Sequence, residues 1–262
     1  MYLHSNIGVS SKAVPIKSSH WVYKVGLKAI TLDVGCTLIY ESSCEGVKPS
    51  DTMVKGASAL AEYLRSKGFN VTSEAILRSI TLWSKIRTKY FSEYMEYSSI
   101  LRMYYILKLL GITPSPTLVE EARRAFVKAS IRARRLYDDV VDFLAWVKGL
   151  GIKIAAISNA TSHEEVIETL KYFNILNYFD VVVTSNITIY KKPLREIFDI
   201  TLELLSVKSS EVIHLGDSLA DVDGALSAGY LRAIEVARHR ECLTRYCVKS
   251  LKEAKELLMK FL

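Results

Sequence analysis

Asp33 is the first residue of this chain whose type and place suggest chemistry. It comes directly after Leu27–Leu32, a short and mostly apolar run that is typical of a buried strand. A carboxylate at the carboxyl end of a buried parallel strand lies where open α/β sheets bind their ligands. Gly35 follows two residues later, and a glycine lets the backbone turn sharply and come close to a ligand. The stretch therefore predicts a ligand site at this strand end.

Polar residues follow later strand-like runs in the same way. Ser158 and Asn159 come directly after the second run, and Asp217 comes after the fourth, with Asp221 four residues further on. Because the carboxyl ends of parallel strands share one edge of a sheet, we expect these residues to join Asp33 there.

A Lys-Lys-Pro stretch lies between the third and fourth strand-like runs. Lys192 stands before Pro193 at the beginning of a helical segment, and the adjacent Lys191 is the alternative to it. A lysine ammonium would neutralise anionic groups such as a phosphate or a carboxylate.

The elements that must position these residues alternate along the chain from Asp139 onward. After the first run, the expected strands are Ile152–Ile157, Val181–Val183, Val212–Leu215 and Leu231–Val236, and helical segments separate them. This alternation requires right-handed crossovers and predicts a parallel sheet. The expected fold class is therefore α/β, with a Rossmann-like parallel sheet and flanking helices.

A helical insert interrupts this pattern. Residues 50–135 have helical periodicity without a strand signal, which predicts an all-helical cap domain, while 26–49 and 136–262 form the α/β core and 1–25 an N-terminal extension. Four tyrosines at helical spacings are expected in the core of the cap: Tyr90, Tyr94, Tyr97 and Tyr104.

Taken together, the strand-end residues resemble the motifs of the haloacid dehalogenase-like (HAD) hydrolase superfamily over roughly residues 27–262. The first family motif is Asp-x-Asp-x-Thr, and the later ones are a Ser or Thr, a Lys, and a Gly-Asp followed by a second acid. The chain matches them in order at Asp33 and Thr37, at Ser158, at Lys192, and at Asp217 with Asp221.

The resemblance implies Mg²⁺-dependent hydrolysis of a small phosphomonoester through an aspartyl-phosphate. In the family the first aspartate, here Asp33, is the nucleophile. Asp33, Asp217 and the backbone carbonyl of Gly35 would then hold Mg²⁺, an ion that prefers oxygen ligands. Asp221 would complete the metal site by orienting the catalytic lysine or a metal-bound water. The phosphate group would be bound by Ser158, Asn159, Thr37 and Lys192.

Gly35 departs from the motif, because the family has a second aspartate at this position. That aspartate is the general acid and base of the family, so Glu41, a cap residue or the substrate itself would have to replace it. The departure leaves two other functions open. One is a haloacid dehalogenase, although the common dehalogenase pattern has an aromatic residue at this position. The other is a non-catalytic sensor of a phosphorylated ligand that kept the fold.

Composition limits the partners and the location. The net charge of +7 favours anionic partners, but there is no zinc-finger spacing, RNP-like signature or long Lys/Arg run, so small phosphorylated metabolites are favoured over nucleic acid. No run of about 18 apolar residues and no secretory signal is evident, so we expect a cytoplasmic protein without a membrane span. The oligomeric state does not follow from these features.

The cysteines give a weaker indication. The four of them lack Cys-x-x-Cys spacing, which argues against a metal site with sulfur ligands. We expect free, partly buried thiols. A Cys242–Cys247 disulfide is the alternative if the source is a hyperthermophile, in which intracellular disulfides occur.

Overall fold

A computed structural model describes residues 26–260 and 262, so the expectation for residues 1–25 lies outside the described part. Its centre is a six-stranded sheet in which every neighbouring pair is parallel. In sheet order the strands are β5 (Val181–Thr184), β4 (Lys153–Ser158), β1 (Ala29–Leu32), β6 (Val212–Gly216), β7 (Arg232–Val236) and β8 (Cys247–Val248). The first strand of the chain is thus central, with strands on both sides.

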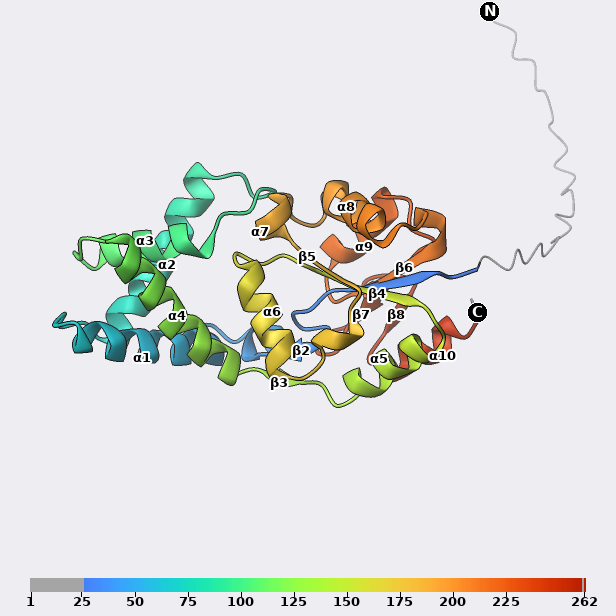
Figure 1. Ribbon diagram of the computed structural model, residues 1–262, viewed down its shortest axis with the longest axis horizontal. Helices are drawn as coiled ribbons and strands as arrows, with labels where there is room; N and C mark the ends of the chain where they lie inside the picture. Colours follow the sequence, from blue (N-terminus) through green and yellow to red (C-terminus); the bar gives the residue numbers. More distant parts are fainter. Residues whose placement is uncertain (1–25, 261) are drawn as a thin grey trace, which may run out of the picture.

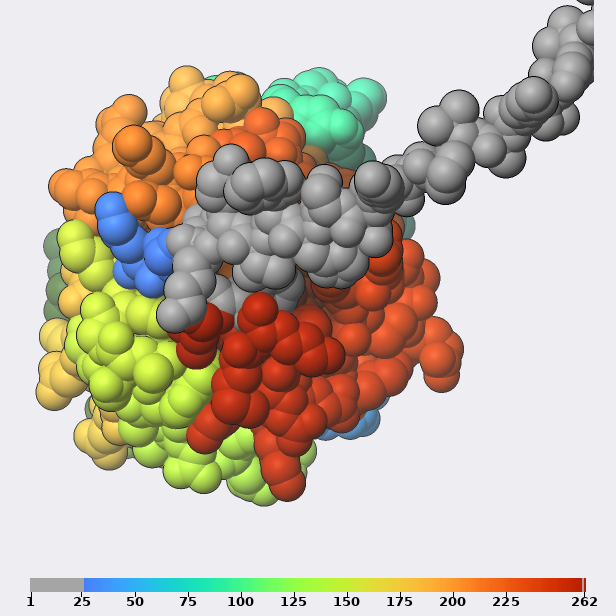
Figure 2. All heavy atoms as spheres, turned by 90° about the vertical axis from the view of Figure 1, so that its right-hand side faces the viewer, coloured from blue at the N-terminus to red at the C-terminus, as the bar shows by residue number. Residues whose placement is uncertain are grey.

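Helices cover both faces of this sheet (Figure 1). One face packs against α8 (Arg195–Leu205) and α9 (Leu219–Ser227), and the other against α5 (Val140–Gly149), α6 (His163–Tyr172) and α10 (Leu251–Leu258). Figure 2, viewed from the end opposite the cap, shows α5 in yellow-green beside α10 in red. The predicted α/β class with flanking helices is confirmed.

Four helices form the cap at one end of the molecule (Figure 1). They are α1 (Asp51–Ser66), α2 (Ser73–Tyr90), α3 (Ser99–Leu109) and α4 (Pro116–Arg132). A Ser or Thr side chain accepts a hydrogen bond from the first turn of each helix, which satisfies a backbone N–H that has no partner within the helix. Their apolar faces meet in a core of their own, separate from those of the sheet.

Short elements connect these layers. The segment after Asp33 contains β2 (Ile39–Tyr40) and a 3₁₀ turn (Ser42–Glu45), and β2 pairs antiparallel with β3 (Arg135–Leu136). The remaining elements are 3₁₀ turns at Leu176–Tyr178 and Ser209–Glu211 and the one-turn helix α7 (Ser185–Thr188). The sequence did not predict β2, β3 or β8, since each is only two residues long. None of the described helices is long and apolar enough to cross a lipid bilayer.

The expectation for the cap tyrosines is wrong for three of the four. Tyr90, Tyr94 and Tyr104 are exposed and not in the cap core. The helix α2 ends at Tyr90, and a segment without helix separates it from α3, so the tyrosines do not share one helical face.

The expectation of free thiols is wrong as well. All four cysteines are paired, as Cys36–Cys44 and Cys242–Cys247, with Cα–Cα distances of 5.4 and 5.7 Å. The chain turns back on itself within each short span, which brings the Cα atoms into the range that a disulfide requires. The first disulfide closes the segment that follows Asp33.

Candidate active site

The end of β1 places Asp33 at the carboxyl edge of the sheet. Its backbone N–H donates to the carbonyl of Leu215 on β6 at 2.9 Å, and its side chain is nearly buried. Thr37 donates its hydroxyl to Oδ2 at 3.3 Å, and Lys192 donates its ammonium to Oδ1 at 2.5 Å. Thr37 is fully buried, so in this structure its hydroxyl serves Asp33 rather than an open cavity.

Lys192 joins two strand ends through one buried ammonium group. Besides Asp33, its Nζ contacts Asp221 Oδ1 at 2.5 Å and the carbonyl of Ile157 at 3.0 Å. The side-chain amide of Asn159 holds the backbone of Lys192 at both ends, with distances of 2.8 Å to its N–H and 3.0 Å to its carbonyl. Of the two adjacent lysines, it is Lys192 that reaches the aspartates.

Asp221 lies at the centre of a buried chain of hydrogen bonds. Its Oδ2 accepts from the backbone N–H and hydroxyl of Ser218 at 3.1 and 2.5 Å, and His214 Nε2 lies 3.2 Å from its Oδ1. Burial would raise the pKa of Asp221, but Lys192 and His214 hold it well below the ordinary value. Both carboxylate oxygens are therefore occupied by donors.

His214 is a member of the site that sequence reasoning did not assign to it. It is fully buried in β6, and its Nδ1 lies 2.7 Å from the hydroxyl of Thr31. Burial lowers the pKa of His214, so the ring is neutral at pH 7. Because a carboxylate only accepts, Nε2 carries the proton and Nδ1 accepts from Thr31. A histidine inside an apolar strand run was the available signal.

Three carboxylates meet beside one ammonium. Oxygens of Asp33, Asp217 and Asp221 lie within 4.8 Å of one another. Burial raises the pKa of Asp33 to about 7, with Lys192 opposing the shift, and burial together with Asp221 raises the pKa of Asp217 to about 6. With all three carboxylates ionised, one ammonium faces three negative charges in a buried place, and that state is costly without a further cation.

This donor set fits a divalent cation such as Mg²⁺, which takes oxygen ligands and would supply the missing positive charge. Asp33 accepts two hydrogen bonds, whereas Asp221 accepts four, as many as a carboxylate has lone-pair sites. Asp33 and Asp217 therefore have the greater capacity to bind the cation. The carbonyl of Gly35 accepts from the N–H of Thr37 at 2.6 Å and keeps a second lone pair.

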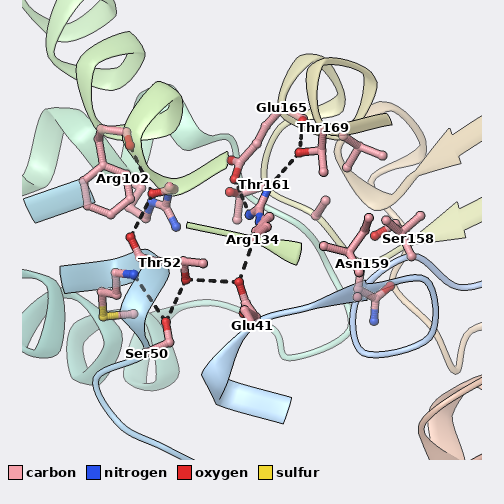
Figure 3. Close-up of a pocket in the computed structure, with 18 of the residues that line it drawn as sticks. Glu41, Ser50, Thr52, Arg102, Arg134, Ser158, Asn159, Thr161, Glu165 and Thr169 are labelled. Atoms are coloured by element: carbon pink, nitrogen blue, oxygen red, sulfur yellow. Dashed lines mark hydrogen bonds and ion pairs between the residues drawn. The ribbon is translucent and has the colours of Figure 1, made fainter. Parts of the chain in front are cut away.

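A cavity of about 350 Å³ lies next to this cluster, between the core and the cap. Gly35 and Ser158 line it from the core, and Arg102 lines it from α3 (Figure 3). A Cβ at Gly35 would meet no atom within 4 Å, and its backbone φ is not positive. The missing side chain therefore leaves open space at the position of the family's second aspartate.

Ion pairs join the two walls of this cavity. Arg134, just after α4, contacts Glu165 of α6 at 2.7 Å and Glu41 at 3.7 Å. Arg123 of α4 is almost fully buried and pairs with Glu120 of its own helix at 2.8 Å and with Glu164 of α6 at 2.6 Å. These arginines connect the cap to the core at two neighbouring points.

Comparison with known proteins agrees with this arrangement. Residues 27–229 match the family model described as haloacid dehalogenase-like hydrolase. A glyceraldehyde 3-phosphate phosphatase of Methanopyrus kandleri is 28% identical over 182 residues, which cover 68% of this chain and 78% of the relative. A phosphorylated carbohydrates phosphatase of Thermotoga maritima is 36% identical over 93 residues, or 36% of this chain and 43% of the relative.

Solved structures share the fold. A HAD phosphatase from Thermococcus onnurineus superposes with a TM-score of 0.60 at 22% identity, covering 88% of this chain and 97% of the other. A 2-haloacid dehalogenase from Pseudomonas syringae superposes with a TM-score of 0.68 at 18% identity, covering 90% and 100%. At these identities the likeness shows the fold alone, and it does not choose between the two activities.

Proposed function

The chain belongs to the haloacid dehalogenase-like hydrolases, and we propose that within this family it hydrolyses small phosphomonoesters with Mg²⁺ as its cofactor. The observation that carries the proposal is the contact of Lys192 with both Asp33 and Asp221, next to the third carboxylate of Asp217. One ammonium among three carboxylates leaves negative charge for a cation to compensate. The two relatives described above, which match 68% and 36% of this chain, are named phosphatases, and this supports the same conclusion.

In this proposal Asp33 is the nucleophile. Its carboxylate oxygen bonds to phosphorus as the bond from phosphorus to the ester oxygen breaks, and the leaving oxygen takes a proton from water because Gly35 supplies no acid. A water molecule then attacks the phosphorus of the aspartyl-phosphate and returns a proton to solvent, which releases inorganic phosphate and restores Asp33. Mg²⁺, held by Asp33, Asp217 and the carbonyl of Gly35, would reduce the repulsion between the carboxylate and the phosphate.

Other residues hold charge and position. Lys192 stabilises the negative charge that the attack brings next to Asp33. Ser158 lines the cavity at the end of β4 and donates its hydroxyl to a phosphate oxygen. Asp221 and the neutral His214 are positioning residues, because they fix the ammonium of Lys192 through a closed chain of hydrogen bonds. Asn159 is also a positioning residue, because its amide holds the backbone of Lys192 through two hydrogen bonds.

A screen of phosphorylated metabolites with Mg²⁺ and with EDTA tests this function. We expect phosphate release that depends on Mg²⁺ and is abolished by EDTA. Turnover of a 2-haloacid that resists EDTA would instead identify a dehalogenase. Tight binding of a phosphorylated compound without any turnover would identify a sensor.

A further inference from the structure

Arg102 is a charged residue in the cavity that the proposed chemistry does not use. It lies on α3, is partly buried, and lines the cavity from the cap side (Figure 3). Its guanidinium carbon is 5.7 Å from the ring centroid of Phe126. Within residues 26–260, no Asp or Glu forms an ion pair with it.

The other charged residues that line this cavity are already engaged. Arg134 contacts both Glu165 and Glu41, and Thr52 donates its hydroxyl to Glu41 at 3.0 Å. Arg134 also donates to the hydroxyl of Thr169 at 2.7 Å. The cavity is lined by two arginines and two glutamates, so its formal charge is zero. Both glutamates contact Arg134, which leaves Arg102 without a partner of opposite charge in the described chain.

A partly buried guanidinium has lost part of its hydration, so a missing anionic partner costs free energy. The planar guanidinium can bind a carboxylate or a phosphate through two parallel hydrogen bonds. An anionic ligand group inside the cavity would therefore meet a group that is already in place.

We propose that Arg102 binds a second anionic group of the substrate, a carboxylate or a second phosphate, at the end away from the ester that Asp33 attacks. The inference rests on the proposed phosphatase function and narrows its substrates to small esters with two anionic ends. A cavity of about 350 Å³ is at the lower end of the range for small-molecule sites, which agrees with a short metabolite. Neutral sugar phosphates would leave the guanidinium of Arg102 unpaired.

A purely structural role for Arg102 is the competing explanation, since its side chain packs on Phe126. Arg87 provides a matched control. It is also a cap arginine stacked on an aromatic ring, with its guanidinium carbon 5.5 Å from the centroid of Tyr97, but it does not line the cavity. A loss of packing should affect both variants in the same way, whereas a loss of anion binding should affect only Arg102.

The test compares three substrates on the full-length enzyme with Mg²⁺. They are 2-phosphoglycolate, with a carboxylate end, propane-1,3-diol bisphosphate, with a phosphate end, and 2-hydroxyethyl phosphate, with a neutral end. For each variant, kcat/KM is divided by the wild-type value on the same substrate, so that differences in leaving group cancel. Thermal melts confirm that the variants are folded.

We expect Arg102→Met to reduce kcat/KM on at least one of the two anionic esters about 10- to 100-fold more than on the neutral ester, the range for a lost hydrogen bond to a charged group. Whether the carboxylate or the phosphate ester suffers more identifies the anion. Arg102→Lys should recover part of the loss, and Arg87→Met should leave all three ratios near one.

Three results would overturn the inference, and they are distinguishable. Equal losses on all three esters in Arg102→Met would mean that the arginine has only a structural role, while the phosphatase function stands. Failure of the wild type to hydrolyse the two anionic esters, with turnover of other phosphomonoesters in the screen, would overturn the inference alone. Failure to hydrolyse any phosphomonoester would refute the proposed function, and the inference would fall with it.

Discussion

The two walls of the cavity differ in how their charges are satisfied. Behind the core wall, Lys192, Asp221 and His214 form a buried network in which each polar side-chain atom has a partner, and none of the three lines the cavity itself. On the cap wall, Arg102 lies in the same cavity without a carboxylate partner in the described chain. A closed network suits chemistry that is the same for every substrate, since its geometry must not change. A charged side chain without a protein partner suits substrate recognition, because the substrate supplies the group of opposite charge.

Removing the proposed nucleophile should have the largest effect of the variants on the core side. Asp33→Asn keeps the shape of the side chain but makes it a poor nucleophile, so we expect turnover to fall by about a thousandfold or more. Asp223→Asn is the matched control, because Asp223 follows the same motif but is exposed and outside the carboxylate cluster. Phosphate release from p-nitrophenyl phosphate measures both. Near-normal activity of a folded Asp33→Asn enzyme would rule out the aspartyl-phosphate.

Variants of the two acids after β6 should distinguish a loss of metal binding from a loss of the position of Lys192. Asp217→Asn removes a carboxylate that is free to bind a cation, and we expect the Mg²⁺ concentration for half-maximal activity to rise about tenfold or more. Asp221→Asn removes the partner of Lys192 and should mainly lower kcat. Activity measured against Mg²⁺ concentration gives both quantities. The assignment is wrong if Asp221→Asn causes the larger shift in Mg²⁺ requirement.

The open space at Gly35 offers a gain of function. Gly35→Asp places a carboxyl where the family has its acid, and the space and backbone conformation accept a Cβ there. General acid catalysis is worth about 10²- to 10⁴-fold, so we expect alkyl phosphates to gain at least several-fold and p-nitrophenyl phosphate much less. Gly35→Ala controls for the loss of backbone freedom.

A series of esters with graded leaving-group pKa, run on the natural enzyme, completes this test. A flat dependence would mean that another residue, such as Glu41 on the cavity wall, already supplies the proton.

The ion pairs of Arg123, one within α4 and one with Glu164 of α6, should give the smallest effect. Hydrogen bonds from Arg123 and, to a smaller extent, from Arg124 lower the pKa of Glu120 to about 2. A carboxyl group with a lowered folded pKa adds stability above its unfolded pKa of about 4.3 and loses it as the pH falls toward 2. We therefore compare the free energy of unfolding of the wild type with that of Arg123→Met at two pH values. The advantage of the wild type should be about 1 kcal/mol smaller at pH 2 than at pH 6, a figure that allows for the partial exposure of Glu120.

Denaturant melts at the two pH values measure this difference. Arg195→Met is the control, because Arg195 pairs with Asp199 on an exposed helix surface. A difference that is independent of pH in Arg123→Met would show that the arginine contributes only packing.

The motif residues of the core could be read from the sequence because each follows an apolar strand. A parallel sheet brings the carboxyl ends of its strands to one edge, so Asp33, Asp217 and Asp221 had to come close once the strands were identified. The same reasoning could not choose between Lys191 and Lys192, since adjacent residues differ only in which way the side chain points. Neither could it assign His214 to the site, because its hydrogen-bond partners, Thr31 and Asp221, lie on other elements that only the fold brings next to it.

The cap shows the opposite case. Its helices follow from periodicity, yet the tyrosines that seemed to share one face are mostly exposed, because α2 ends at Tyr90 and the chain leaves the helix. The disulfide Cys36–Cys44 depends on a turn that local sequence rules did not reveal. Arg102 had no distinguishing signal at all, being one of many basic residues on the cap.

The sequence by itself therefore determined the parallel sheet, the helical insert and the family's chemical groups, because hydrophobic periodicity and strand ends are local properties. Only the tertiary structure decided which lysine meets Asp33, which cysteines pair, and which arginine faces the cavity without a partner. The lysine and arginine contacts depend on segments far apart in the chain, and their distances follow from packing and not from spacing. Each disulfide joins cysteines close in sequence, but it depends on the path of a turn that the spacing alone does not fix.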